Sequence, residues 1–376
     1  MTSPAVESAW SNGAPSRTAR APIDDPSTHT AKFEGVRTSI VNAVRRIVLS
    51  EIPCIAAVRD EARPINVPGG FVVRENTGRI HNDALVDRIA LVPIHLTRSE
   101  VRSFIPGSLT VTLKVANNGS ARINVTSRDL RVNLFDAPHP NGPRCYPPCP
   151  ITGDWPLITR LYPGESIDLV ATMEKATASR HAAFATVSLA AMSPALDADK
   201  YMAERREIER DETLREDART EALNLHDHIR RKQTIKYGDD GEPVWHDLKI
   251  ESVCGLTARE ICAEAIEILA NKFSSSALAY EATTEGDSLV FTISGQGHTF
   301  GNVLQDLCMN GREELGIRSI GYYETHPLED RVVIRVDFGE SPDERAASAD
   351  AQEVITKLRA HCLAKIEGVR DSASLS

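Results

Sequence analysis

The sequence predicts an α+β protein that contains two similar modules, each a helix pair on an antiparallel sheet, and a mostly β domain inserted into the first module. Two observations carry this prediction. The order strand, helix, strands, long helix occurs in the outer parts of residues 31–273 and again in residues 288–376. Residues 58–159 hold short alternating segments and many turn residues, which are typical of a compact β domain.

Composition places the chain among globular proteins of two or three domains: its 376 residues are 41% apolar and 26% charged. The net charge is −10, whereas proteins that grip nucleic acid usually have a basic surface, so direct nucleic-acid binding is disfavoured. No stretch approaches the ~20 apolar residues of a membrane span, so no membrane partner is expected. Seven cysteines without a framework predict reduced thiols in the cytosol or nucleus, not a secreted protein.

The first module is predicted to comprise residues 31–57 and 160–273. Residues 1–30 are rich in Ser, Thr, Ala and Pro and predict a disordered tail, with a transit peptide as the alternative because acidic residues are scarce there. Gly35–Glu51 has apolar residues at helical spacing and predicts a helix, which Pro53 ends. Ile55–Val58 then predicts a strand.

Inside the insertion, the alternation of Ser108–Val115 is the clearest strand signal in the chain. Shorter strands are predicted at Arg122–Val125 and Leu130–Leu134, with Asn117-Asn118-Gly119 as a hairpin turn. A helix is expected over Asn82–Ala90. The proline-rich stretch 138–156 predicts an irregular loop.

The chain then returns to the first module through strands at Ser166–Met173, Ala183–Ala191 and Leu248–Val253. Residues 199–236 are densely charged, and 199–232 predict a solvated helix or helix pair. Thr257 and Glu260 form the pattern of a capping box, which predicts an amphipathic helix that runs to Phe273. Residues 274–287 begin with three serines and predict a flexible linker.

The second module is predicted from residues 288–376. A strand at Ser288–Ile293 leads into a helix that begins at His298 or Thr299 and ends near Met309. Thr299 is the predicted cap of that helix. Further elements follow in the order strand, strand, helix, at Ile320–Tyr323, Arg331–Phe338 and Asp343–Ile366.

Five segments of residues 31–273 resemble the larger alpha-like polypeptides of multisubunit RNA polymerases, namely bacterial alpha, the archaeal D family and the third subunit of RNA polymerase II. Asn42–Pro53 is similar to the first-helix signature of that family, and His81–Ile94 to its second signature. Gly164–Leu169 and Ser179–Phe184 match the strand and loop after its insertion. Glu251–Phe273 resembles its terminal dimerisation helix.

The second module resembles the partner family, which contains the archaeal L family and the eleventh subunit of RNA polymerase II. Gly297–Leu304 is similar to the His-Thr-Leu-Gly-Asn signature, and Gly321–Leu328 to the second motif. The resemblances imply a fusion of two partner subunits, which is familiar from large nucleocytoplasmic DNA viruses. They therefore imply a nuclear location or a cytoplasmic viral factory, with packaging in virions as a further expectation.

The resemblance implies that the two helix pairs meet in a four-helix interface, large enough to be obligate because apolar burial contributes ~25 cal/mol per Å². The interface residues expected from the four apolar stripes are Val44, Ile47, Val48, Ile261, Ile268, Leu269, Phe300, Val303, Leu304, Leu307, Ile355 and Leu358. The implied function is a non-catalytic assembly platform for DNA-dependent transcription. The implied partners are the largest and second-largest polymerase subunits and a small tenth-subunit-like protein.

By the same resemblance, Arg45, Arg46, Asp87 and Arg88 are expected to contact the catalytic subunits, and arginine suits this role because its planar fork pairs with carboxylates. A solvated helix face is the alternative for each of these residues. No catalytic motif is found in the sequence. The alternative function is a protein-interaction scaffold outside a polymerase.

No cofactor is expected. Many third-subunit relatives hold zinc in a four-cysteine cluster, but this chain has no cysteine between Cys54 and Cys145. Cys145 and Cys149, with His139 upstream, offer at most three ligands of a tetrahedral site, so they are weak metal candidates, and a disulfide or plain thiols are the alternatives. A thiol or zinc enzyme that uses these cysteines is a third, less favoured function.

Overall fold

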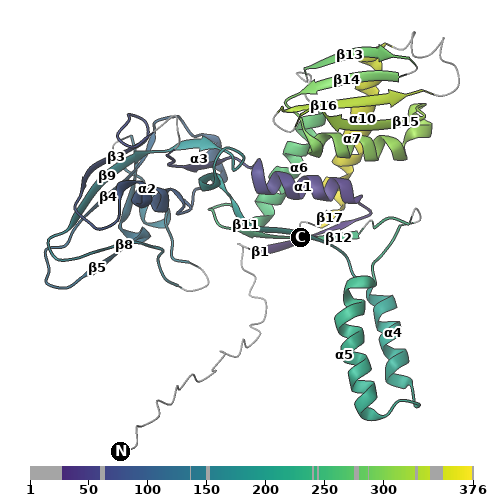
Figure 1. The fold of residues 1–376 in the computed structure, drawn as a ribbon, viewed down its shortest axis with the longest axis horizontal. Helices are drawn as coiled ribbons and strands as arrows, with labels where there is room; N and C mark the ends of the chain where they lie inside the picture. The colour runs from purple at the N-terminus through teal and green to yellow at the C-terminus, as the bar shows by residue number, and fades with distance from the viewer. Residues whose placement is uncertain are drawn as a thin grey trace, which may run out of the picture.

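The computed structural model describes residues 28–59, 64–135, 137–149, 153–238, 241–243, 245–274, 279–286, 288–326, 329–338 and 350–374. It has helices and antiparallel sheets throughout, which confirms the predicted α+β class. Figure 1 shows the insertion domain at one end, the two modules stacked at the other, and a helical hairpin that projects from the first module. In the described ranges, no helix combines the length and apolarity needed to cross a membrane.

The first module is a four-stranded sheet covered by two helices. The strand order is β11-β12-β1-β17, and all pairs are antiparallel. The strands are β1 (Thr28–Glu34), β11 (Val187–Pro194), β12 (Trp245–Ser252) and β17 (Ala373–Ser374), and the helices are α1 (Thr38–Ser50) and α6 (Ala258–Ser274). Because β17 follows the last helix of the second module, that module extends the sheet of the first (Figure 1).

The second module repeats this topology. Its strand order is β15-β16-β14-β13, so β14, β15 and β16 occupy the places of β1, β11 and β12. The strands are β13 (Tyr280–Glu285), β14 (Ser288–Ser294), β15 (Ser319–Glu324) and β16 (Arg331–Asp337), and the helices are α7 (His298–Asn310), α8 (Arg312–Leu315) and α10 (Ala351–Ser372). In both modules one helix follows the first common strand and the other follows the last.

The insertion domain has its own hydrophobic core, which includes Phe71, Leu85, Leu113 and Ile158. A five-stranded sheet in the order β3-β9-β4-β6-β7 and a β5-β8 pair surround it. The strands are β3 (Phe71–Asn76), β4 (Leu109–Ala116), β5 (Ile123–Thr126), β6 (Leu130–Leu134), β7 (Ala137–Pro138), β8 (Leu157–Leu161) and β9 (Ser166–Thr172), and the helices are α2 (Asn82–Ala90) and α3 (Arg98–Arg102). Strands β2 (Cys54–Ala56) and β10 (Glu174–Ala176) pair where the chain enters and leaves this domain.

The charged segment forms the helical hairpin of α4 (Ala198–Arg210) and α5 (Glu216–Gln233). Neither helix of the hairpin joins the core of the module, and polar contacts hold the two together. Arg230 pairs with Glu204 at 2.8 Å, and Arg205 pairs with Asp227. The hairpin is thus a solvated helix pair inserted between β11 and β12 (Figure 1).

Three sequence predictions are wrong in the first half of the chain. Strand β1 is absent from the predicted elements, and it begins within the residues expected to be a disordered tail; residues 1–27 lie outside the described residues. The first helix begins at Thr38, because Gly35 has a φ of 69° and turns the chain after β1. Asn117–Gly119 does not form a hairpin, since β4 pairs with β6 and β9 while β5 pairs with β8.

Further corrections concern the second half. Strand β13 lies within the predicted linker, and its six residues pair with β14. The strand predicted at Ala183–Ala191 begins with a 3₁₀ turn, and β11 starts only at Val187. The last helix extends to Ser372, well beyond Ile366; residues 343–349, where it is expected to begin, are outside the described residues.

Candidate interface between the modules

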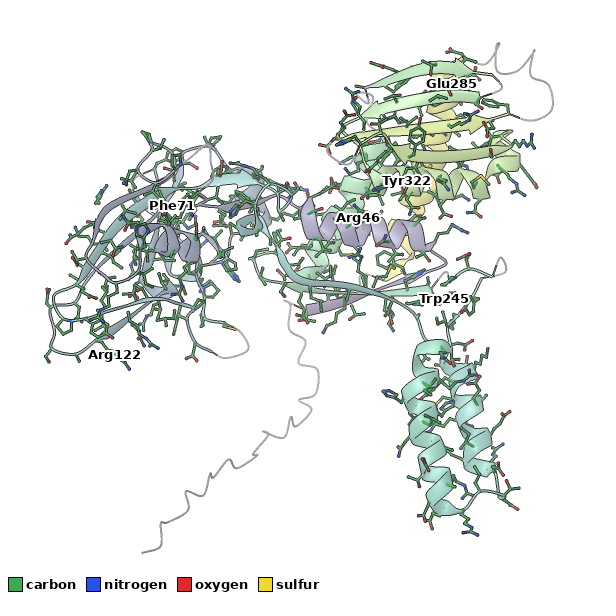
Figure 2. The ribbon with its side chains drawn as sticks, in the orientation of Figure 1. Arg46, Phe71, Arg122, Trp245, Glu285 and Tyr322 are labelled. Atoms are coloured by element: carbon green, nitrogen blue, oxygen red, sulfur yellow. The ribbon has the colours of Figure 1, made fainter. Side chains whose placement is uncertain are left out.

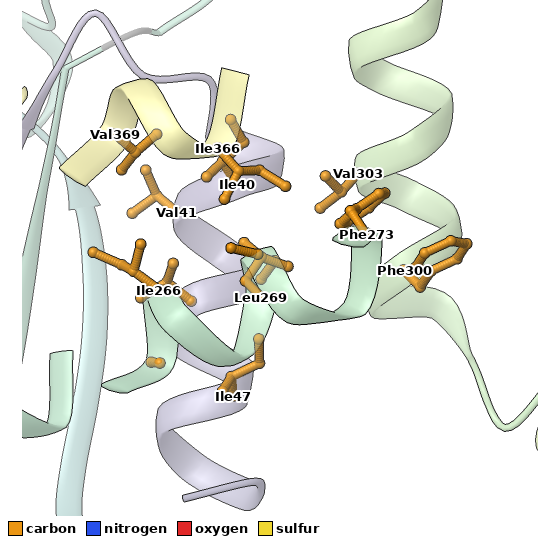
Figure 3. Close-up of a cluster of buried hydrophobic side chains, with 14 of the residues drawn as sticks. Ile40, Val41, Ile47, Ile266, Leu269, Phe273, Phe300, Val303, Ile366 and Val369 are labelled. Atoms are coloured by element: carbon orange, nitrogen blue, oxygen red, sulfur yellow. The ribbon is translucent and has the colours of Figure 1, made fainter. Parts of the chain in front are cut away.

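The two modules meet through four helices that surround one hydrophobic core. Helix α6 packs against α1 and α10, and α7 packs against the same two helices from the other side. The buried residues of both modules form a single cluster that includes Ile40, Leu269, Val303 and Ile366. Figure 3 shows these side chains pointing toward one another from all four helices.

The residues expected at this interface all belong to that cluster. Every one of them is buried except Ile268, which is half-buried and packed against the cluster. The apolar stripe predicted from the sequence leaves out Ile266 and Cys262, which are also buried on α6. Because α6 has helical neighbours on two sides, it buries a wider face than a single apolar stripe.

An aromatic pair joins the modules at the end of α6. The rings of Phe273 and Phe300 stack with their centroids 4.6 Å apart and their planes 19° from parallel. Arg359 of α10 donates from Nε to the carbonyl oxygen of Phe273 at 3.0 Å. Since carbonyl groups in the last turn of a helix lack intrahelical partners, Arg359 caps α6 from the other module.

A polar seam lies at one edge of the four-helix core. Arg37, at the N-cap of α1, pairs with Asp306 of α7 at 2.9 Å, and Ser39 donates to the same carboxylate at 2.5 Å. The side chains of Arg37 and Asp306 are only 23% and 25% exposed, so the pair is partly shielded from solvent. An open cavity of about 350 Å³ borders both residues. The sequence does not reveal this pair, because nothing in the local pattern distinguishes Asp306 from a solvated residue.

A second polar seam lies at the opposite edge, where Arg46 of α1 faces β15 of the second module. Figure 2 shows Arg46 beside Tyr322. Burial raises the pKa of the Tyr322 phenol, Glu324 raises it further, and Arg46 lowers it, so both charges act on this ring. Glu324 also accepts from the backbone N–H of His298 at 2.8 Å and pairs with its ring at 3.1 Å.

The prediction that Thr299 caps α7 is wrong. The N-cap residue is Gly297, which has no side chain that could bond to the helix. The carboxylate of Glu324 takes that role from a different strand, as a negative charge at a helix N-terminus favours. The neighbouring Gly301 packs under the ring of Tyr322, where an added Cβ would lie within 3.0 Å of three ring atoms.

The four predicted contact residues lie in two different domains. On α1, Arg45 is half-buried and donates to Asn42 at 3.0 Å, while Arg46 is exposed at the second seam. On α2, Asp87 accepts two hydrogen bonds from Arg59, which raises the pKa of that guanidinium. Arg88 is exposed on the same helix. Asp87 is therefore already engaged within the chain, whereas Arg46 and Arg88 present their side chains to solvent.

The insertion domain is attached to the interface through α3, a helix absent from the sequence predictions. Arg98 and Arg102 both pair with Glu264 of α6, the latter at 3.0 Å. Thr97 and Glu100 form a capping box at the start of α3. That Thr-x-x-Glu pattern is visible in the sequence and is the signal that could have identified the helix. The two ion pairs fix the insertion domain against α6.

The weak metal candidates lie in the insertion domain. His139 accepts from the N–H of Asn141 at its Nδ1, and its Nε2 lies 3.5 Å from Glu100. Cys145 lies 3.7 Å from Nδ1, and burial raises the pKa of its thiol to about 11, which disfavours the thiolate that metals bind. Cys149 is half-buried. Among the described residues, no three or more potential ligands are grouped to hold a metal ion. The expectation that no cofactor is bound stays a prediction.

Two modules of one topology, each with a helix pair that completes the core of the other, define a protein built from tandem dimerisation domains. The profile of the RNA polymerase Rpb3/Rpb11 dimerisation domain matches residues 30–273, and a second profile with the same description matches residues 288–371. The chain belongs to this family. It carries two of the family's domains in tandem, which is consistent with a fusion of the two subunits.

Curated relatives match the two modules separately. The chain is 25% identical over 160 residues to the DNA-directed RNA polymerase subunit Rpo3 of Pyrobaculum calidifontis, which covers 40% of this chain and 53% of that protein. It is 27% and 28% identical over 86 residues to the Rpo11 proteins of Saccharolobus shibatae and Saccharolobus solfataricus, which covers 23% of this chain and 90% of those proteins. The chain thus spans about half of the Rpo3 relative and most of the Rpo11 relatives.

Proposed function

We propose that this protein is a non-catalytic assembly subunit of a multisubunit DNA-dependent RNA polymerase, in which a fused alpha-like heterodimer nucleates the binding of the catalytic subunits. The observation that carries the proposal is the single core shared by α1, α6, α7 and α10. Relatives of the first and second modules are named as separate polymerase subunits. A shared core between two such modules supports their action as one pre-paired unit.

The proposed partners are the largest and second-largest polymerase subunits and a small tenth-subunit-like protein. Arg45 and Arg88 are the basic residues we propose for these contacts, together with Arg46. Arg88 is exposed in the last turn of α2, and Arg45 is half-buried on α1. Arginine at such positions suits bidentate pairing with carboxylates of a partner.

The proposal is tested by purifying the tagged full-length chain from its native source and identifying the co-eluting proteins. Catalytic polymerase subunits are expected in stoichiometric amounts. The variants Arg45→Glu and Arg88→Glu are expected to reduce that recovery at least about tenfold, since like charges juxtaposed at an interface cost several kcal/mol. Arg331→Glu is the matched control, because Arg331 is an exposed arginine on β16 of the second module.

An eluate without catalytic subunits contradicts the proposal and favours a scaffold that acts outside a polymerase. Variants with unchanged recovery contradict the assigned contact residues only. We also propose a viral source, a nuclear or viral-factory location and packaging in virions, on the ground of the fused architecture alone. Immunolabelling of infected cells and analysis of purified virions test that part.

A further inference from the structure

Helices α1 and α7 are equivalent parts of the two modules. Each has 13 residues, follows the first common strand of its sheet, and carries an asparagine at its fifth position, Asn42 and Asn302. Their buried apolar positions coincide when counted from the first residue of each helix. On α1 these positions are Ile40, Val41, Ala43, Val44, Ile47 and Val48, and on α7 they are Phe300, Gly301, Val303, Leu304, Leu307 and Cys308.

This equivalence gives the modules a pseudo-twofold relation across the four-helix core. Counted in the same way, Arg46 of α1 corresponds to Asp306 of α7, and the N-cap Arg37 corresponds to the N-cap Gly297. The observed seams agree with this relation. Asp306 pairs with Arg37, and Arg46 lies beside Tyr322, whose ring packs against Gly301 in the first turn of α7.

The two modules therefore carry opposite charges at one equivalent position. When a first module pairs with a second, Asp306 meets Arg37 at one seam, and at the other Arg46 lies beside Tyr322, two residues before Glu324 on β15. If two first modules paired in the same geometry, each Arg37 would meet an Arg46, and β11, the counterpart of β15, has no acidic residue to separate them. If two second modules paired, each Asp306 would approach the carboxylate of a Glu324.

We infer that the charges at the two seams select the partner of each module: a first module accepts a second module and rejects another copy of itself, and the reverse holds for a second module. The partner surface is thus a module of the opposite kind, in the same chain or in a second copy. The placement of the buried apolar positions does not discriminate in this way, because these positions coincide on α1 and α7. Like-charge juxtaposition at the partly buried Arg37 and Asp306 does.

The selection matters in a fused chain. Pairing of like modules would join two chains at each contact, and a chain with two self-complementary faces would assemble into open polymers. Pairing of unlike modules satisfies both modules within one chain, as in this structure. This inference rests on the proposed function only in taking the two modules as partners, and its test involves no polymerase subunit.

The test reverses one charge at a time in the full-length chain. The cavity that borders Arg37 and Asp306 leaves room for a longer side chain, so steric clash does not confound the change. Isotopically labelled and unlabelled chains are co-folded from denaturant, cross-linked, and analysed by mass spectrometry. This measurement separates links within a chain from links between chains and identifies the modules that each link joins.

In the wild-type protein, links between modules are expected to join first to second modules. In the pair of unlike modules, Asp306→Arg places an arginine opposite Arg37, which repels it. In a pair of second modules, the same arginine would lie opposite Glu324, which attracts it. It is expected to raise the share of second-to-second links between chains at least about tenfold. Arg37→Asp is expected to raise first-to-first links instead. Asp330→Arg, the same change at an exposed position of the second module, is the control and should leave the pattern unchanged.

The inference stands or falls on which kind of link each variant raises. If neither variant raises like-with-like links, or if both raise the same kind of link, the inference is wrong and the ion pair acts only as a local contact. The double variant Arg37→Asp/Asp306→Arg restores attraction between unlike modules and is expected to regain the wild-type thermal midpoint. If the single variants do not fold, a double variant that also fails to fold overturns the inference. Absence of catalytic subunits from the native eluate would overturn the proposed function and leave this result untouched.

Discussion

The substitution Phe300→Ala is expected to destabilise both modules at once. Phe300 is fully buried on α7, and its ring stacks on Phe273 of α6 (Figure 3). Removing a buried phenylalanine side chain costs about 3–5 kcal/mol through lost transfer energy and the residual cavity. Of this, about 0.5–1.5 kcal/mol is the stacking that is lost with the ring.

The location of the loss distinguishes a shared core from two separate ones. The midpoint of a domain of this size shifts by roughly 2–4 °C per kcal/mol, so the unfolding transition of the paired modules should fall by about 6–20 °C. The insertion domain has its own core and should unfold in its own transition. Differential scanning calorimetry, with far-UV circular dichroism in urea, measures the two transitions separately.

Phe71→Ala is the matched control, because Phe71 is equally buried but lies in the insertion domain. It is expected to shift the transition of that domain and to leave the paired modules nearly unchanged. If Phe300→Ala shifts a transition of the second module alone while the first keeps its midpoint, the modules do not share a core. The reasoning on which the proposed function depends would then be refuted.

Three further outcomes follow from local geometry. Gly301→Ala should lower the free energy of unfolding by about 1–3 kcal/mol, because the added Cβ would lie within 3.0 Å of the ring of Tyr322. Gly368→Ala is the control and should be neutral or stabilising, because no neighbouring atom would lie within 4 Å of its Cβ. Thermal unfolding compares the two variants. Thr257→Ala should cost about 1 kcal/mol in urea unfolding, because it removes the capping box of α6. Burial lowers the pKa of His246 below 6.5, so the imidazole binds a proton more readily in the unfolded chain than in the folded one. The stability contributed by neutral His246 is therefore present above pH 6.5 and is lost as the pH falls toward the folded pKa. His246→Gln should flatten the dependence of the free energy of unfolding on pH in this range.

The spacing of apolar residues correctly predicts the helices whose buried face is encoded within their own sequence. Helix α2 has the predicted bounds, since its apolar residues face a single core. The stripes of α1 and α7 are correct for the same reason, and so is the capping box at Thr257. In each of these cases the residues that decide the structure lie within one or two helical turns of one another.

The missed elements depend on partners that lie far away in the chain. Strand β1 is polar on one face and buries only Ala31 and Phe33, and it pairs with β12, more than two hundred residues later. Strand β13 is almost fully exposed and exists because β14 offers it an edge. Asn117, predicted as a turn residue, is instead buried and donates to the carbonyls of Ala121 and Leu161. Tertiary pairing overrides local preference at such positions.

The same limit applies to the interface, where the role of a charge cannot be inferred from one module alone. Arg46 is recognisable as part of a helix signature. Its equivalence in position to Asp306 becomes visible only when the residues of α1 and α7 are counted from the start of each helix. Arg37 and Asp306 are separated by 269 residues, and neither belongs to an apolar stripe. Separate segments of sequence reveal the apolar surfaces that meet, whereas the charges that select the partner require the pairing geometry.

The connection between the two modules is shorter than the sequence predicts. The sequence predicts a flexible linker over residues 274–287, but α6 ends at Ser274 and β13 begins at Tyr280, which leaves five residues between them. Five residues reach ~18 Å at most, and closing the shorter connection costs roughly 1 kcal/mol less chain entropy. Because Phe273 already contacts Phe300 at the end of α6, the connection starts at the interface itself. A short tether raises the effective concentration of the partner module to the order of millimolar, and the charges at the two seams then act on a partner that is already present.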